Sequence, residues 1–226
     1  MIIASKDNST VKRFGKLHDR KERDKSGKYL IEGYRAVKDS LPYIGGAELL
    51  LSESASEKFS AEFSEFDSAV CTDRIFSSVS DTETSQGVLC IADKKLSEQN
   101  YEAKYALFLD RIRDPGNMGT IIRTALAVGF NEIYCLDCVD PYNPKVVRSA
   151  MSAVSRVNLH LVEEEELSRL KENGYTIICA DMGGQSVFDC EAAPQKICLI
   201  VGNEANGVSE DIITMSDIVP ACMIGQ

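Results

Sequence analysis

Apolar strands that alternate with helices in the second half of the sequence limit the possible folds more than any other feature. The runs that predict strands lie at 105–109, 132–136, 157–161, 175–180, 197–201 and 218–223. The stretches that predict helices lie at 117–128, 144–155, 163–172 and 209–215. Strands that are apolar on both faces are typical of parallel sheets covered by helices on both sides. The sequence therefore predicts an α/β domain with a mostly parallel sheet.

The first half predicts a smaller α/β domain. Its predicted helices lie at 11–23, 34–41 and 53–66, and its strands at 29–31, 47–51, 69–72 and 87–92. The segment 93–104 is polar, has no strand pattern and is predicted to link the two domains. We therefore expect one domain at 1–95 and a second at 105–226.

The charge is distributed unevenly along the chain. The net charge is −10, yet residues 1–38 contain eleven Lys or Arg and only five acidic residues. A basic N-terminal segment on an acidic body is typical of proteins that bind nucleic acid, because phosphate attraction depends on the local patch. The alternative is a solvated charged helix without a ligand.

Compartment and metal use follow from what the sequence lacks. No apolar run approaches the ~20 residues of a membrane span, and the first residues do not have the layout of a secretory signal, so a cytoplasmic protein is expected. Most of the eight cysteines lie in apolar stretches and are interpreted as buried thiols. Cys135 and Cys138 form one C-x-x-C pair, but a zinc site would need a second pair or histidines at ligand spacing, and the only histidines are His18 and His160, so no metal is expected.

The loop after the strand at 105–109 is the first candidate site. Asn117 is a suitable N-cap for the following helix, and Gly119 allows close approach of another backbone. Arg123 lies four residues beyond Gly119, hence on the same helix face. An arginine in the first turns of a helix opposes the helix dipole, which a polyanionic ligand would offset. The alternative is an ordinary turn before a helix.

The loop after the strand at 197–201 is the second candidate. Gly202 and Gly207 enclose the carboxylate of Glu204 and would let backbone groups contact a ligand directly. The loop is neither a dinucleotide fingerprint nor a Walker loop, which argues against a dinucleotide-dependent enzyme.

Taken together, the two loops (N-x-G-x-x-x-R and G-N-E-x-x-G), the segment 143–149 and a final strand ending near Gly225 resemble the SpoU (TrmH) class of RNA ribose 2′-O-methyltransferases. The first half resembles that family's small substrate-binding domain. The residues that carry this second resemblance are Ser5, Asn8, Lys12, Leu17, Arg23, the Glu32-Gly33 pair and the Gln86-Gly87 pair.

The resemblance implies a SPOUT-like domain with a C-terminal trefoil knot, S-adenosylmethionine as cofactor and a homodimer. It implies transfer of a methyl group to a ribose 2′-hydroxyl, in ribosomal RNA more than in transfer RNA. Asn117, Arg123 and Glu204 would be catalytic. The cofactor contacts would be Gly202, Gly207, Val219, Ala221 and Met223. The alternative is a non-catalytic RNA-binding member of the same fold.

The residues expected to contact RNA are basic and lie mainly in the N-terminal segment. They are Lys12, Arg13, Lys21, Arg23, Lys28, Arg35, Arg113, Lys145 and Arg148.

The C-terminus departs from the family pattern, in which isoleucine–proline–methionine–x–glycine precedes serine–leucine–asparagine and a closing helix. Here the sequence reads Val219-Pro220-Ala221-Cys222-Met223-Ile224-Gly225-Gln226, and the cofactor contacts shift by one or two residues with the alignment. The domain is accordingly expected to lack its final helix in this sequence.

Overall fold

The computed structural model describes residues 2–95, 97–179 and 194–218 in two compact units. The first unit contains residues 1–95 together with 140–156, and the second contains 96–139 and 157–226. The segment 140–156, which lies between two strands of the second unit in sequence, therefore packs with the N-terminal residues. The division into domains at 1–95 and 105–226 stays a prediction.

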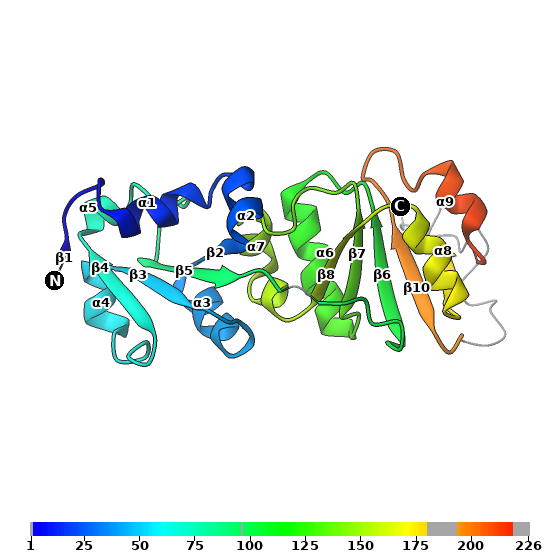
Figure 1. Ribbon diagram of the computed structural model, residues 1–226. Coiled ribbons are helices and arrows are strands. Elements are labelled where there is room, and N and C mark those ends of the chain that lie inside the picture. Colours follow the sequence, from blue (N-terminus) through cyan, green and yellow to red (C-terminus); the bar gives the residue numbers. More distant parts are fainter. Residues whose placement is uncertain (1, 96, 180–193, 219–226) are drawn as a thin grey trace, which may run out of the picture. The chain divides into compact units, whose positions relative to one another are not determined.

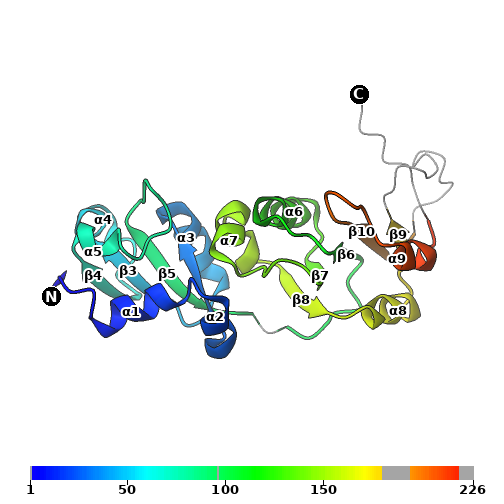
Figure 2. The ribbon, with the colours of Figure 1, turned by 90° about the horizontal axis from the view of Figure 1, so that it is seen from above.

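A mixed five-stranded sheet forms the centre of the first unit (Figures 1 and 2). Its strands, in the order β1-β4-β3-β5-β2, are β1 (Ile2–Ile3), β4 (Asp67–Cys71), β3 (Glu48–Ser52), β5 (Val88–Asp93) and β2 (Lys28–Glu32). β5 is antiparallel to both of its neighbours, and the remaining pairs are parallel. The helices are α1 (Ser9–Lys16), α2 (Arg20–Ser26), α3 (Tyr34–Ser40), α4 (Glu53–Phe59), α5 (Asp73–Phe76) and α7 (Pro144–Ala150), with short 3₁₀ turns at Leu41–Tyr43 and Ala153–Ser155.

The second unit has an all-parallel five-stranded sheet, as the apolar strands predicted (Figure 1). Its order β8-β7-β6-β10-β9 comprises β8 (Asn158–Val162), β7 (Glu132–Leu136), β6 (Tyr105–Asp110), β10 (Ile197–Val201) and β9 (Thr176–Cys179). Its helices are α6 (Pro115–Val128), α8 (Glu165–Glu172) and α9 (Glu210–Met215). None of the helices described is long and apolar enough to cross a membrane.

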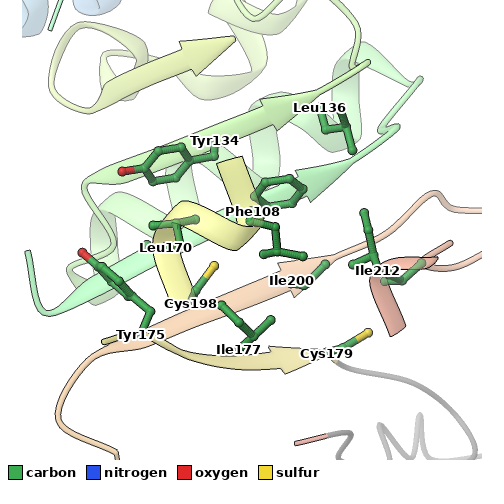
Figure 3. Close-up of a cluster of buried hydrophobic side chains, with 13 residues drawn as sticks. Phe108, Tyr134, Leu136, Leu170, Tyr175, Ile177, Cys179, Cys198, Ile200 and Ile212 are labelled. Carbon is green, nitrogen blue, oxygen red and sulfur yellow. The ribbon is translucent and has the colours of Figure 1, made fainter. Parts of the chain in front are cut away.

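Alternation along the strands directs two sets of side chains to opposite faces of this sheet. Phe108, Tyr134 and Ile200 pack with Leu170 of α8 and Ile212 of α9 in one buried cluster (Figure 3). The other face of the sheet is covered by α6, which lies on the side opposite α8 (Figure 2). Helices thus cover much of both faces of the sheet, in agreement with its apolar strands.

Local capping explains where the expected helices were wrong. The helix expected at 11–23 is two helices, because Asp19 caps α2 by accepting a hydrogen bond from the Lys21 N–H at 2.8 Å. The helix expected at 117–128 begins at Pro115, since Asp114 and not Asn117 is its N-cap. Proline is favoured at the first helical position because it has no N–H to satisfy.

Two further helices end earlier than expected, and two short elements were not expected. The helix expected at 53–66 ends at Phe59, and the turns that follow include Ser64, whose hydroxyl donates to the Ala61 carbonyl. The helix expected at 144–155 ends at Ala150, because the positive φ of Met151 breaks it. The short elements β1 and α5 were not expected.

A buried ion pair fixes the segment 140–156 within the first unit. Arg23 is 1% exposed and donates to Asp140 Oδ2 from Nε at 2.9 Å and from Nη2 at 2.7 Å. Its Nη1 donates to the carbonyl oxygens of Leu17 and His18. The expectation that Arg23 contacts RNA does not fit this burial, because its guanidinium is fully engaged inside the protein.

We predict that Arg23→Met lowers the free energy of unfolding by about 3–5 kcal/mol, because it leaves the Asp140 carboxylate buried without a counter-charge. Urea denaturation followed by circular dichroism measures this loss. The matched control is Arg20→Met, which removes an exposed pair with Asp24 and should cost less than about 1 kcal/mol. Equal, small losses in both variants would contradict the structural role of Arg23.

Candidate active site

The two candidate loops leave the sheet at the same edge. β6 and β10 are adjacent parallel strands, with Leu109 opposite Val201. The loops that follow them therefore emerge side by side, at the carboxyl end of the strands, where ligands of open α/β sheets bind.

The loop at 202–207 is closed on itself by Asn203. The Asn203 side-chain oxygen accepts hydrogen bonds from the N–H groups of Ala205 and Asn206 at 3.0 and 3.1 Å, and its carbonyl accepts from the Gly207 N–H at 2.9 Å. A Cβ at Gly202 would lie 2.3 Å from the backbone nitrogen of Val208, and Gly207 has a φ of +68°. Both glycines are thus required by the closure of the loop, and their predicted cofactor contact remains a prediction.

Two side chains join this loop to the one after β6. The Asn203 amide donates to the carbonyl oxygen of Arg111 at 2.9 Å. Glu204 Oε1 accepts from the Asn117 amide at 3.1 Å and from the Asp114 N–H at 3.4 Å. Asn117 and Glu204, which are 87 residues apart, are therefore in contact, as the pairing of the two motifs suggested.

The carboxyl group of Glu204 is stabilised as an anion. Partial burial raises the pKa of Glu204, but hydrogen bonds from its own backbone N–H, from Asn117 and from the Asp114 backbone outweigh this effect, so the pKa lies below its usual value. An ionised carboxylate only accepts hydrogen bonds. The Asn117 amide therefore directs its NH₂ group to Glu204, and its carbonyl oxygen is left to accept a hydrogen bond from a ligand.

The base of the site is a buried carboxylate that the sequence analysis did not select. Asp110 is fully buried at the end of β6 and accepts two hydrogen bonds from Arg111, at 2.9 and 3.1 Å. It also accepts from the Ser209 N–H at 2.8 Å, just beyond the Gly202–Gly207 loop. Arg111 has a φ of +56°, which is uncommon for a residue other than glycine. An aspartate directly after a buried strand was the available signal for this role.

Arg123 is an exposed residue of α6. It forms no hydrogen bond or ion pair with any residue in 2–95, 97–179 or 194–218, so it contacts neither Asn117 nor Glu204 there. Arg113, in contrast, pairs with Asp137. Arg123 is therefore a cation without a protein counter-charge in the described part of the chain, which suits an anionic ligand.

The remaining predicted cofactor residues, Val219, Ala221 and Met223, lie outside the described residues. The chain is described up to Ile218, whose carbonyl accepts from the Cys179 N–H at 3.0 Å. Ile218 forms a parallel bridge with Ile178. The segment that leads to these three residues thus runs beside β9.

The residues expected to bind RNA fall into three groups. Arg23 is buried. Lys12, Arg13, Lys28, Arg113 and Arg148 form ion pairs with acidic neighbours. Lys21, Arg35 and Lys145 are exposed, and their side chains have no polar partner among the described residues.

The described cysteines are buried, apart from the half-buried Cys138. Burial raises the pKa of Cys138 to about 11 and that of Cys135 well above its usual value. In the part of the chain that the structure covers, no group of three potential ligands could hold a metal ion.

Each half of the chain matches a known protein family. Residues 104–224 match the SpoU rRNA Methylase family, and residues 8–90 match the MRM3-like substrate binding domain. The 23S rRNA (guanosine(2553)-2′-O)-methyltransferase RlmP of Bacillus subtilis is 31% identical over 222 residues, which cover 96% of this chain and 88% of the relative.

Solved structures share the fold. An AdoMet-bound rRNA methyltransferase from Sinorhizobium meliloti superimposes with a TM-score of 0.82 at 24% identity, over 97% of this chain and 87% of its own. The SpoU methyltransferase AviRb from Streptomyces viridochromogenes, in complex with AdoMet, also has a TM-score of 0.82, at 20% identity, over 97% and 90% of the two chains.

We predict that Asn203→Asp loosens the junction between the loops, because it keeps the oxygen that closes the 202–207 turn but removes the donor to the Arg111 carbonyl. Amide hydrogen exchange should accelerate at residues 111–117 and 203–207 and stay unchanged in β7. The expected loss of stability is about 1 kcal/mol, the net contribution of one hydrogen bond. Unchanged exchange in both loops would show that the Asn203 contact does not hold them together.

Proposed function

Because the chain belongs to the SpoU rRNA methylase family, we propose that it transfers a methyl group from S-adenosylmethionine to a ribose 2′-hydroxyl of ribosomal RNA. The observation that carries this proposal is the contact of Asn117 with Glu204, which unites the family's two motifs at one edge of the sheet. By similarity to RlmP, we propose a guanosine of 23S rRNA as the target nucleotide.

The described part of the site fits the cofactor. The loop at 202–207 is held in one conformation by Asn203, and it follows β10 at the edge of the sheet where ligands bind. Gly202, Gly207 and the segment containing Val219, Ala221 and Met223 would hold S-adenosylmethionine. When bound, this cofactor supplies an electrophilic methyl group on sulfur.

The residues of the chain orient the attacking ribose. Glu204 fixes the Asn117 amide, whose free carbonyl oxygen would accept the hydrogen bond of the 2′-hydroxyl. A guanidinium is effectively never deprotonated, so Arg123 is no general base. We assign it the neighbouring RNA phosphate and the developing negative charge on the ribose oxygen. The ribose oxygen would receive the methyl group of the bound cofactor, and the hydroxyl proton would pass to water or to that phosphate.

The proposal includes the homodimer and the C-terminal trefoil knot that the resemblance implies. An apolar hollow of about 240 Å³ between α6 and the sheet supports the dimer, with Ile121, Phe130 and Leu199 in its wall and Val128 62% exposed at its rim. Among the described residues nothing covers this hollow, and such a surface favours contact with another apolar surface. Sedimentation velocity of the whole protein measures the oligomeric state.

The test of the proposed function is methylation mapping in a strain from which the gene has been deleted. One ribose 2′-O-methyl group of 23S rRNA should be lost, and the wild-type gene should restore it. The Arg123→Ala variant should not, because loss of one charge-stabilising donor lowers the rate of transfer by about 100- to 1000-fold. In calorimetry, the variant should bind S-adenosylmethionine as the wild type does.

Arg169→Ala, which removes an exposed arginine of α8, serves as the control and should restore the mark. If the affinity of Arg123→Ala for S-adenosylmethionine falls as steeply as its activity, the catalytic role of Arg123 is wrong. Unchanged methylation in the deletion strain, with transfer RNA also unaltered, would instead favour the non-catalytic RNA-binding alternative.

A second prediction concerns the basic face of α2. Lys21 and Lys25 are exposed, without a side-chain partner in the described segments, and should contact RNA phosphates. The double variant Lys21→Gln/Lys25→Gln should weaken RNA binding and reduce the slope of log K against log salt by about two, one per lost phosphate contact. Filter binding at several salt concentrations measures the slope. Arg74→Gln, at an exposed position of α5, is the control, and an equal slope in all three proteins would exclude α2 from the RNA interface.

A further inference from the structure

A hollow of about 360 Å³ lies within the first unit and is lined by none of the candidate active-site residues. It is bordered by the turn between β2 and α3, by the loop that precedes β5 and by α7. Its wall includes Gly33, Arg35, Thr84, Gln86, Arg148 and Met151. Its volume lies within the range of about 300–1,000 Å³ that is usual for ligand sites.

Arg148 is fixed at this hollow with an unused donor. Its Nη2 pairs with Asp81 at 3.1 Å, and its Nη1 lies 3.6 Å from Glu32. Nη1 is buried and has no hydrogen-bond acceptor among the described residues. Glu32 also accepts from Thr82 at 2.7 Å and thereby holds the adjacent loop. A buried donor without an acceptor is unfavourable in the free protein and would gain a partner from a ligand.

The other polar groups at the hollow are also without partners. The Arg35 guanidinium, the Gln86 amide and the Thr84 hydroxyl are exposed and form no hydrogen bond with residues that the structure describes. The Arg35 guanidinium thus offers an unpaired positive charge, whereas the charge of Arg148 is offset by Asp81 and by Glu32, which also lines the hollow. The hollow also offers an amide, which can both donate and accept. This combination fits an anion joined to a polar, planar group.

Met151 adds an apolar surface in a strained conformation. Its φ and ψ of +58° and −126° lie in a region that favours glycine, and its side chain is 38% exposed although it is large and apolar. Strained residues of this kind cluster at ligand sites, where the surrounding structure maintains them. The flexible thioether is suited to pack against an aromatic ring.

We propose that this hollow binds one unpaired nucleotide of the RNA substrate. Arg35 binds its phosphate, Gln86 and the unused Nη1 donor of Arg148 bond to the edge of its base, and Met151 packs against the base face. Sequence-specific RNA recognition is directed mainly at such unstacked nucleotides, whose base edges are accessible. The inference rests on the proposed function only in taking RNA as the ligand.

The test uses the full-length protein labelled with ¹³C at its methionine methyl groups. Titration with GMP, AMP, CMP or UMP should shift the Met151 resonance, assigned through Met151→Leu, to saturation. The resonance of Met118, which is fully buried in the second unit, should not move. Inorganic phosphate alone should shift Met151 little. No saturable shift, or an equal shift with inorganic phosphate, would overturn the nucleotide site.

Substitutions at the hollow test whether it contributes to RNA binding. Arg35→Gln and Gln86→Ala should each weaken binding of 23S rRNA fragments about tenfold, as expected for loss of a hydrogen bond to a charged or desolvated group. The affinity for S-adenosylmethionine should not change. Lys58→Gln, an exposed cation of α4 in the same unit, is the matched control. Unchanged RNA affinity in both test variants would also overturn the proposal.

The two proposals fail in different ways. If mononucleotides shift Met151 but the protein methylates no RNA, the proposed function fails while the nucleotide site stands. If RNA is methylated and neither the resonance nor the variants respond, the nucleotide site fails while the proposed function stands.

Discussion

The parallel pairing of β6 with β10 is the constraint on which the candidate site depends. These strands are 92 residues apart in sequence, as the pairing of Tyr105 with Ile197 shows, yet they share one ladder and end at the same edge. Asp110 strengthens this edge, because its buried carboxylate accepts hydrogen bonds from the loop after β6 and from the backbone at Ser209. A buried carboxylate needs such partners, and here they are the two segments that carry the motifs.

The polar groups of the site form a chain of hydrogen bonds that begins at the buried carboxylate of Asp110 and ends at Asn117. Asp110 holds Arg111, the Arg111 carbonyl receives the Asn203 amide, and the loop closed by Asn203 presents Glu204 to Asn117. Each group is fixed by the one beneath it, and the carbonyl oxygen of the Asn117 side chain has no partner among the described residues. Preorganised groups of this kind contribute to catalysis because they need not reorganise during the reaction.

Features of the structure that depend on local sequence were predicted better than features that depend on residues far apart in the chain. The parallel sheet and the bounds of β7 and β10 followed from apolar runs between polar or glycine-containing turns. The break between α1 and α2 was missed because Asp19 can either continue a helix or cap a new one, and the sequence pattern did not distinguish the two. Asn117 and Glu204 were expected together and are in contact, although their catalytic roles remain predictions. Asp110 and Asn203 were missed because their hydrogen-bond partners include backbone groups far away in the sequence, although the place of Asp110 directly after a buried strand was a usable signal.

Counting the basic residues of the N-terminal segment overstates how many of them can bind RNA phosphates. Of the eleven basic residues among the first 38, six form ion pairs, and the partners lie as far along the sequence as Asp140. In the described part of the chain, Lys6, Lys16, Lys21, Lys25 and Arg35 have no such partner. Salt-dependent affinity for a polyanion reflects counterions released at phosphate contacts, to which an already paired cation contributes less. The N-terminal segment therefore offers RNA about five unpaired cations, fewer than its composition suggests.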